Sequence, residues 1–164
     1  MKVFITGGTG FLGKRIVQKL LNEGHTILLF TRKGETLPVW HQKGKSQFFT
    51  LFGDVVQINR VANKIKKFHP DVAVHLAWEG IPSPNPRFNK RNLAGGLQTI
   101  ETLAQAGCKT MIVAGSCHEY GEPGKKVNER SPLRPYNTLY ATKVKLYKQG
   151  SKIAARYNMR FIWT

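Results

Sequence analysis

A glycine-rich segment near the start of the chain, TGGTGFLG at residues 6–13, constrains the fold most strongly. It follows a short apolar run at 2–6, typical of a buried strand, and precedes leucine and isoleucine side chains at helical spacing. In the pattern GxxGxxG, Gly7 permits a tight turn, Gly10 lets the backbone approach a diphosphate, and Gly13 lets the helix pack closely. The helix N-terminus adds free N–H groups and a partial positive charge. The segment therefore predicts a dinucleotide site between a strand and a helix.

Strand and helix patterns continue to alternate along the chain. Apolar runs predict further strands at 25–30, 46–54, 71–78, 110–116 and 159–164. Helical spacing predicts helices at 11–21, 56–68, 92–107 and 139–156, and three prolines predict a loop at 79–90. This alternation favours an α/β fold, a doubly wound parallel sheet of the Rossmann type with helices on both faces, in one domain spanning 1–164.

The end of the second predicted strand bears on which dinucleotide would bind. In such folds an acidic residue at this place binds the ribose 2′-hydroxyl of NAD. Here the strand ends in Thr31, Arg32 and Lys33. Arg32 can hold a 2′-phosphate through two parallel hydrogen bonds, and no carboxylate stands in this place to repel one. The sequence therefore favours NADP over NAD, with the alternative that Arg32 and Lys33 are ordinary surface charges of a basic protein.

Charge and cysteine content bear on partners and compartment. The formal net charge is +17, which is compatible with binding to polyanions or with a solvated basic surface. Because lysines and arginines are spread along the chain without a basic tail, the second interpretation is favoured, and nucleic acid is not an expected partner. No apolar run reaches the roughly 20 residues of a membrane span, so we expect no membrane association. Cys108 and Cys117 lack metal-type spacing and are typical of free thiols in a reducing cytoplasm.

Together the motifs resemble the extended short-chain dehydrogenase/reductase family, and more narrowly its NAD(P)-dependent epimerase/dehydratase branch, which works largely on nucleotide sugars. The motifs that carry the resemblance are TGGTGFLG, GDV at 53–55, DVAVHLAW at 71–78, Asn92, AGSCHEYG at 114–121 and LYATK at 139–143. Each motif alone is modest, but their order and spacing are specific. The resemblance covers essentially the whole chain.

The resemblance implies a set of cofactor contacts along the ends of the first four strands. These are Gly7, Thr9, Gly10, Phe11, Leu12, Gly13, Arg32, Lys33, Asp54, Val55, Leu76, Ala77, Trp78, Asn92 and Lys143. Asp54 would contact the adenine, and it can also cap the helix pattern that follows it. Trp78 stands where small residues are common in the family, so it either lines the cleft or belongs to the core.

The resemblance also implies catalytic residues. The family's catalytic Ser/Thr falls on Ser116, whose hydroxyl would bond the substrate oxygen, although a serine at a strand end can also satisfy a turn. The Asp-Glu pair of the sugar 4,6-dehydratases falls on Cys117 and His118, which argues against sugar dehydration.

The family's Tyr and Lys are separated by three residues, whereas Tyr140 and Lys143 are separated by two. The Tyr exchanges a proton as hydride moves, and the Lys lowers the Tyr pKa. Helical geometry places Lys145, Lys148, Lys152 and Arg156 on a solvated stripe, opposite Tyr140 and Lys143. Since residues at i and i+3 share a helix face, the dyad can survive the shorter spacing. We therefore predict Ser116, Tyr140 and Lys143 as catalytic.

These expectations lead to one function and one alternative. The first is an NADP-preferring oxidoreductase or epimerase acting on a nucleotide sugar by hydride transfer. The alternative is a catalytically impaired NAD(P)-binding sensor or scaffold of the same fold. Family members continue into a small C-terminal lobe that holds the sugar nucleotide; we expect this chain, ending before that lobe, to bind cofactor but turn over little substrate alone. The resemblance also suggests a homodimer through 92–107 and 139–156.

Overall fold

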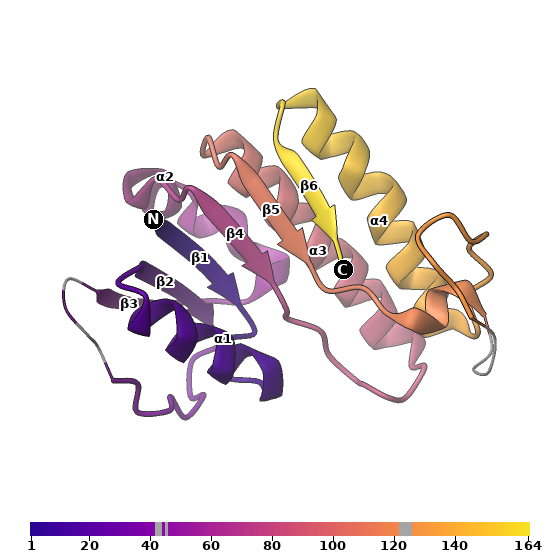
Figure 1. Ribbon diagram of the computed structural model, residues 1–164, viewed down its shortest axis with the longest axis horizontal. Coiled ribbons are helices and arrows are strands. Elements are labelled where there is room, and N and C mark those ends of the chain that lie inside the picture. Colours follow the sequence, from indigo (N-terminus) through magenta and orange to yellow (C-terminus); the bar gives the residue numbers. More distant parts are fainter. Residues whose placement is uncertain (42–43, 45, 122–125) are drawn as a thin grey trace.

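The computed structural model describes residues 1–41, 44, 46–121 and 126–164. Within these ranges six parallel strands form one sheet in the order β3-β2-β1-β4-β5-β6 (Figure 1). The strands are β1 (Lys2–Thr6), β2 (Thr26–Thr31), β3 (Gln47–Phe52), β4 (Val72–His75), β5 (Thr110–Val113) and β6 (Arg160–Trp163). The predicted parallel sheet is confirmed.

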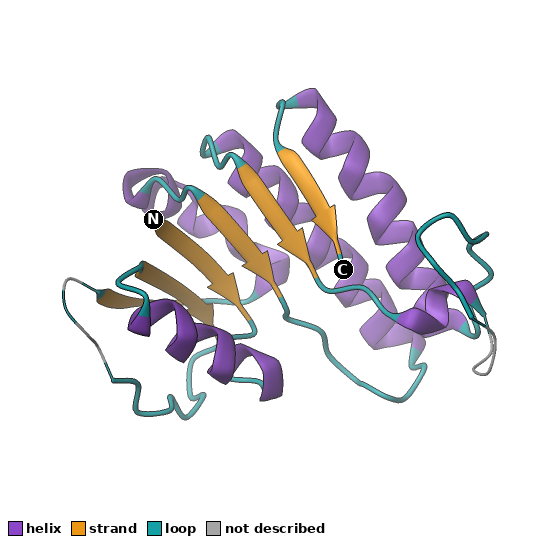
Figure 2. Ribbon diagram, viewed as in Figure 1, coloured by secondary structure: helices purple, strands orange, loops and turns teal. Residues whose placement is uncertain are grey.

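Helices cover both faces of the sheet, as expected (Figure 2). The α-helices are α1 (Phe11–Asn22), α2 (Ala62–Phe68), α3 (Pro86–Gln105) and α4 (Thr138–Arg156), and two short 3₁₀ segments are η1 (Val55–Val61) and η2 (Cys117–Tyr120). Helix α1 packs on one face, whereas α2, α3 and α4 pack on the other. A central strand such as β1 is buried on both faces, so its interior positions are apolar, and the side chains of Val3, Phe4 and Ile5 are almost fully buried.

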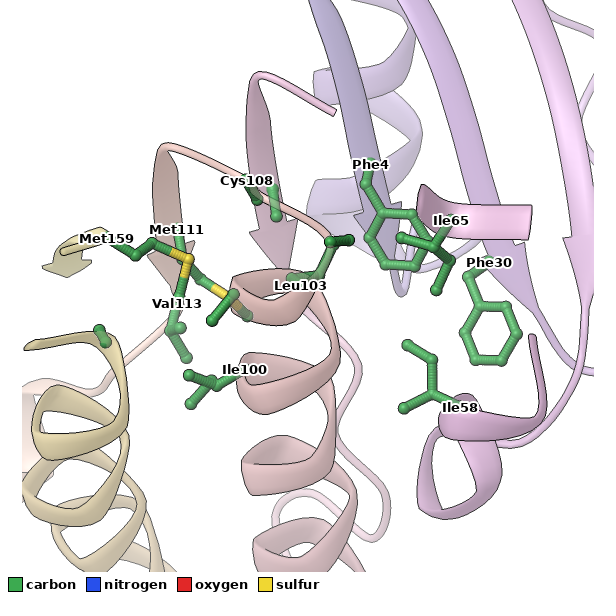
Figure 3. Close-up of a cluster of buried hydrophobic side chains, with 14 of the residues drawn as sticks. Phe4, Phe30, Ile58, Ile65, Ile100, Leu103, Cys108, Met111, Val113 and Met159 are labelled. Atoms are coloured by element: carbon green, nitrogen blue, oxygen red, sulfur yellow. The ribbon is translucent and has the colours of Figure 1, made fainter. Parts of the chain in front are cut away.

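The larger core lies between the sheet and helices α2 to α4 (Figure 3). Phe4 and Phe30 from the sheet meet Ile58 and Ile65 at one end of this core. Small residues let α3 and α4 approach each other at the other end. A Cβ added at Gly96 would come within 2.7 Å of the Leu146 side chain, so a larger residue there would push the helices apart.

The predicted loop at 79–90 is wrong in its second half, because α3 already begins at Pro86. Proline is favoured at the first helical position, where its missing N–H would have no partner in any case. Asn85 caps this helix, since its side-chain oxygen accepts a hydrogen bond from Arg87 N at 2.9 Å. The prolines therefore mark a helix start as well as a loop.

The strands predicted at 71–78 and 110–116 end three residues earlier than expected, the strand predicted at 46–54 ends two residues earlier, and one predicted helix is broken. Strand β4 ends at His75 and β5 at Val113, so the segments 76–78 and 114–116 leave the sheet as loops. The predicted helix at 56–68 divides into η1 and α2 at Val61, whose backbone angles (φ −114°, ψ 12°) are not helical. Gln57 interrupts η1 itself. The loops that leave β4 and β5 lie at the carboxyl edge of the sheet, where residues are free to face a ligand.

The strand order fixes where a ligand site can form. From β1 the chain builds outward through β2 and β3, and then returns to place β4 on the other side of β1. Connections after β1 and β4 therefore run to opposite sides, which leaves a crevice beyond the carboxyl ends of these two strands.

Candidate active site

The glycine loop lies at this crevice and has the backbone geometry that a diphosphate requires. Gly7 has φ +71°, and a Cβ added there would come within 2.6 Å of Ala77 N. A Cβ at Gly13 would collide with the Gly7 carbonyl oxygen. Gly10 is the N-cap of α1 and supplies no side-chain cap, and the first turn of this helix carries no acidic residue. The free N–H groups therefore suit an anion.

A first cleft of about 350 Å³ opens on the β1–β2–β3 side of the crevice. Of the predicted cofactor contacts, the structure places here Gly7, Thr9, Gly10, Arg32, Asp54, Val55, Leu76, Ala77, Trp78 and Asn92. Lys33 is exposed and lines neither this cleft nor the second one described below. The cleft also contains Glu35 and Glu79, which the sequence did not single out.

A network of ion pairs borders the first cleft. Arg91 joins Asp54 at 2.6 Å and Glu79 at 3.0 Å, and Arg32 joins Glu35 at 2.5 Å and Glu79 at 3.4 Å. Burial raises the pKa of Asp54, but the hydrogen bonds from Val56 N and from the Arg91 guanidinium outweigh it, and the net effect lowers this pKa. Asp54 is therefore ionised at neutral pH. It also caps η1, as one of its two predicted roles required.

This network bears on the expected NADP preference. Arg32 does lie in the cleft, but its guanidinium already contacts two carboxylates, Glu35 and Glu79. A 2′-phosphate would have to compete with both. The preference stays a prediction. No sequence signal marked Glu79 or Arg91, because their partners lie 12 to 47 residues away along the chain.

Asn92 is a buried side chain with a clear structural role. Its Oδ1 accepts a hydrogen bond from Glu79 N, and its Nδ2 donates one to the Glu79 carbonyl, both at 2.9 Å. This pair fixes the backbone directly after Trp78. Asn92 thus holds one wall of the first cleft in place.

A second cleft of about 290 Å³ opens on the β4–β5 side. The predicted residues found here are Phe11, Leu12, Gly13, Ser116, Tyr140 and Lys143. The two clefts share a wall, which consists of Gly7, Gly10, Leu76, Ala77 and Trp78. They are therefore two halves of one groove along the carboxyl edge of the sheet.

The shorter spacing of Tyr140 and Lys143 does not separate them, since both line the second cleft together with Ser116. The Tyr140 ring packs against His118, with 4.8 Å between centroids. Its hydroxyl makes no hydrogen bond within the described part of the chain and is available to a ligand. Ser116 Oγ accepts a hydrogen bond from His118 N at 3.3 Å, so it does satisfy a turn, in line with the alternative interpretation of this serine.

Lys143 is buried, with only 5% of its surface exposed, whereas the stripe of Lys145, Lys148, Lys152 and Arg156 is exposed as predicted. Its Nζ donates a hydrogen bond to the Ala114 carbonyl at 2.7 Å and lies 4.1 Å from the centre of the Trp78 ring. Burial lowers the pKa of Lys143 to about 8, and the carboxyl of Glu119 acts in the opposite direction. The lysine therefore sits close to the boundary between its charged and neutral forms.

His75, at the end of β4, is a second buried base in this cleft. Its Nδ1 lies 2.7 Å from Thr6 Oγ1, and Thr6 Oγ1 also accepts a hydrogen bond from Ala77 N. Burial, together with the nearby charge of Lys143, lowers the pKa of His75 to about 4. His75 is therefore neutral at physiological pH. No sequence signal indicated this role, since histidine within an apolar strand is equally typical of the core.

Known proteins share the sequence pattern of this chain. It matches the NAD dependent epimerase/dehydratase family over residues 3–164. It is 27% identical over 137 residues to dTDP-6-deoxy-L-talose 4-dehydrogenase (NAD(+)) of Aggregatibacter actinomycetemcomitans, covering 84% of this chain and 49% of that protein. It is 31% identical over 131 residues to CDP-paratose 2-epimerase of Salmonella typhi, covering 74% of this chain and 38% of that protein.

Solved structures share the fold. UDP-glucose 4-epimerase from Brucella ovis, solved in complex with NAD, superposes with a TM-score of 0.83 at 20% identity, covering 99% of this chain and 50% of that one. The Bordetella bronchiseptica enzyme WbmG in complex with NAD gives a TM-score of 0.79 at 20% identity, with 99% and 52% covered. The chain thus spans about half the length of these proteins.

The family match extends over nearly the whole chain, and the strand order and the glycine loop agree with it. The chain belongs to the NAD dependent epimerase/dehydratase family.

Proposed function

We propose that this chain forms the cofactor-binding half of an oxidoreductase or epimerase that acts on a nucleotide sugar by hydride transfer. The observation that carries the proposal is the shared wall of the two clefts. It joins a polar cleft beside Asp54 to a cleft that contains Ser116, Tyr140 and Lys143. A dinucleotide lying across this wall would have its adenosine in the first cleft and its nicotinamide in the second.

The residues present fit a dinucleotide cofactor. The uncapped N-terminus of α1 would hold the diphosphate, and the ionised Asp54 could accept a hydrogen bond from the adenosine. Leu76, Ala77 and Trp78 would lie beneath the nicotinamide end. When bound, a nicotinamide cofactor supplies a hydride acceptor or donor.

The second cleft offers groups for the accompanying proton transfer. The free hydroxyl of Tyr140 could take a proton from a sugar hydroxyl, or return it, and Ser116 could orient the same oxygen. The ammonium of Lys143, 5% exposed in the same cleft, would stabilise the tyrosinate. Because Cys117 and His118 replace an Asp-Glu pair, we propose hydride chemistry without dehydration.

The proposed substrate class rests on the relatives. The two curated relatives named above act, by their names, on sugars linked to dTDP and CDP. A nucleotide sugar is therefore the proposed substrate. Since the chain spans 49% and 38% of these relatives, we expect it to bind cofactor but to turn over little nucleotide sugar by itself. Ready turnover by the 164-residue chain would contradict this expectation.

A single glycine variant tests the cofactor proposal. Gly10 has ordinary backbone angles, and a Cβ there would meet only the Gly7 carbonyl oxygen, at 3.3 Å. Gly10→Ala should therefore fold, while its methyl group obstructs the diphosphate. We expect the affinity for NADH and NADPH, measured by calorimetry, to fall roughly tenfold or more, about 1.4 kcal/mol.

The control is Gly24→Ala, at the far end of α1, where nothing lies within 4 Å of the added methyl group. Because Gly24 has φ +80°, this change strains the backbone away from the glycine loop, so it controls for a loss of stability without an obstructed diphosphate. Its affinity for both nucleotides should equal that of the unaltered chain. Equal binding by Gly10→Ala and the unaltered chain, with both folded by circular dichroism, would contradict the proposed position of the diphosphate.

A second candidate is a nicotinamide-binding sensor or scaffold without catalysis. The observation that favours it is the bond from Lys143 to the Ala114 carbonyl, which directs the ammonium toward the backbone. Tyr140→Phe separates the two functions. Under the enzyme proposal this change abolishes whatever slow turnover the chain shows and leaves cofactor affinity intact. Slow turnover that is the same in Tyr140→Phe and in the unaltered chain would contradict the enzyme proposal and favour the sensor or scaffold.

A further inference from the structure

A buried hydrogen bond joins the segment after Ser116 to the edge of the sheet, and the proposed chemistry does not use it. Glu119 lies in η2, three residues after Ser116, and only 2% of its surface is exposed. Its Oε2 accepts a hydrogen bond from Trp163 Nε1 at 2.9 Å, here called the Glu119–Trp163 link. Trp163 belongs to β6, the edge strand beside β5. Among the described residues, no other side chain of η2 makes a hydrogen bond to a strand.

Gly115, directly before Ser116, gives the indole room to form this link. A Cβ added at Gly115 would come within 2.3 Å of Trp163 Nε1 and 2.6 Å of the Thr164 backbone oxygen. Any larger residue there would displace the indole or the backbone that follows β6. Gly115 N also donates a hydrogen bond to the same Thr164 oxygen at 2.6 Å. Trp163 and Thr164 therefore hold the chain on both sides of Ser116.

Hydrogen bonds within η2 carry this support to Ser116 itself. Glu119 N donates to the Ser116 carbonyl at 3.1 Å, and His118 N donates to Ser116 Oγ at 3.3 Å. The serine hydroxyl is therefore oriented by the first turn of η2, and the Glu119 side chain anchors that turn to the sheet. On the outer side, the Glu119 carbonyl accepts a hydrogen bond from Arg134 N at 2.9 Å. Because Ser116 lines the second cleft, a shift of η2 would move its hydroxyl within that cleft.

A glutamate at this position is a poor choice for stability alone. Its Oε1 is buried and has no hydrogen-bond partner among the described residues. A buried carboxyl with one unsatisfied oxygen costs free energy, whereas an apolar side chain of similar size would avoid that cost. In some proteins such buried polar groups fix one arrangement of the chain at the expense of stability. The cost at Glu119 therefore favours a positional role for the link.

We propose that Glu119 and Trp163 are positioning residues, which hold the Ser116 hydroxyl at the second cleft by tying η2 to β6. The link needs a donor at Trp163 and an acceptor at Glu119, but no charge. The inference rests on the proposed function for the role of Ser116 in binding the substrate oxygen. The link itself is a property of the ligand-free chain, and it is tested there.

The test is amide hydrogen exchange of the ligand-free chain, followed by NMR. The reporter is the His118 amide, because it donates to Ser116 Oγ. Trp163→Phe keeps a ring beside Tyr147 and Phe161 and removes the N–H donor. We expect the His118 amide to exchange roughly tenfold faster or more than in the unaltered chain. This acceleration should exceed that of the amides of β1, which report on global stability.

The matched control is Trp40→Phe. Trp40 Nε1 also donates one hydrogen bond, to the Lys14 carbonyl, but on the opposite face of the sheet, so its loss should leave the His118 amide unchanged. Glu119→Gln is the rescue variant, because the glutamine carbonyl can still accept the Trp163 hydrogen bond, and it should keep the slow exchange of the unaltered chain. Glu119→Leu, which has no acceptor, should match Trp163→Phe.

A further pair of variants tests whether the link acts on the serine hydroxyl. In Ser116→Ala the His118 amide has lost its acceptor, so adding Trp163→Phe should accelerate its exchange little further. An equally large acceleration with and without the serine hydroxyl would overturn the proposal, because the link would then hold η2 without fixing that hydroxyl.

An unchanged His118 amide in folded Trp163→Phe would also overturn the proposal. If the variants that break the link do not fold, the unaltered chain decides. Opening of the link frees both the Trp163 indole N–H and the His118 amide, so the two should show similar protection against exchange. A protected indole together with an unprotected His118 amide would overturn the proposal. Failure to bind nucleotide would contradict the proposed function and leave these exchange results unaffected.

Discussion

At the scale of single residues, the carboxyl edge of the sheet combines two buried bases, His75 and Lys143, within one cleft. Burial lowers the pKa of each, because neither ammonium nor imidazolium is well solvated there. When the pKa of a base is lower in the folded chain than in the unfolded chain, only the unfolded chain binds a proton at pH values between the two. The free energy of unfolding therefore decreases as the pH falls through this range. The pH dependence of stability in the acid range therefore contains a contribution from His75, beside those of Asp54 and Glu119, whose pKa values are also shifted.

The sign of this effect for His75 follows from its two pKa values, about 4 in the folded chain and 6.5 for a freely solvated histidine. Between these values the unfolded chain binds a proton that the folded chain does not. The free energy of unfolding should therefore decrease as the pH falls from 6.5 to 4, with a contribution on the order of 3 kcal/mol. The carboxyl of Glu119 has a raised pKa, so its contribution to the free energy of unfolding has the opposite sign. That contribution is present with or without His75.

His75→Gln should remove this contribution, and His41→Gln, an exposed histidine, should not. The measurement is urea denaturation of all three chains across this pH range. A slope for His75→Gln equal to that of the unaltered chain would show that His75 is not the buried neutral base described here.

Arg32 gives a second prediction at this scale. If it binds the 2′-phosphate, Arg32→Ala should weaken NADPH binding roughly tenfold or more and leave NADH binding almost unchanged. Lys33→Ala is the control, since Lys33 is an adjacent cation that lines neither cleft. Equal NADPH affinities for the two variants and the unaltered chain would mean that Glu35 and Glu79 neutralise Arg32 and that NADP is not preferred.

At the scale of elements, the caps of α3 and α4 position the groove. Asn137 caps α4, and its Oδ1 accepts hydrogen bonds from Leu139 N at 2.9 Å and from Tyr140 N at 3.3 Å. The first turn of α4 carries Tyr140, so this cap fixes the backbone of the proposed proton-transfer residue. Fraying here would affect both stability and the cleft.

Asn137→Ala should lower the free energy of unfolding by about 1 kcal/mol, whereas Asn137→Asp should retain the cap and most of the stability. Chemical denaturation measures both. If Asn137→Ala is as stable as the unaltered chain, the first turn of α4 does not depend on this cap.

Elements were predictable from the sequence wherever a local pattern determines them. The glycine loop, the six strands and the exposed lysines of α4 follow from short-range spacing, and the structure confirms them. The start of α3 was missed, because prolines mark both loops and first helical turns. The ends of β4 and β5 were placed too late, since apolar residues that line a cleft have the same pattern as a strand interior.

Parts of the site depend on long-range contacts and could not be predicted. Glu119 meets Trp163 across 44 residues, and Arg91 meets Asp54 across 37. A single sequence does not reveal which glutamate or arginine is buried beside which partner. By contrast Ser116, Tyr140 and Lys143 were predicted, and they share one cleft, although their catalytic roles stay predictions.

At the scale of the whole molecule, the net charge of +17 bears on assembly. In the homodimer expected through 92–107 and 139–156, the basic stripe of one copy would lie near the same stripe of the other copy. This stripe consists of Lys145, Lys148, Lys152 and Arg156. Like charges repel, and salt screens the repulsion. We therefore expect any such dimer to be stronger at high salt than at low salt.

Sedimentation of the chain at low and high salt measures this effect. Lys148→Glu should strengthen association at low salt, whereas Lys14→Glu, an exposed residue on α1 at the opposite face, should not. A chain that is monomeric under every condition would contradict dimerisation through these helices.

Within the described ranges, none of the helices has the length and apolar character to cross a membrane.

The most direct test of the central claim, that the two clefts form one dinucleotide groove, is a titration of the chain with NADPH and with NADH, followed by tryptophan fluorescence. Trp78 lines both clefts, so a dinucleotide lying across them must contact its indole ring. We predict saturable quenching that is largely lost in Trp78→Phe, with tighter binding of NADPH. Absence of saturable binding of either nucleotide at low salt, by a chain shown to be folded, would contradict the claim.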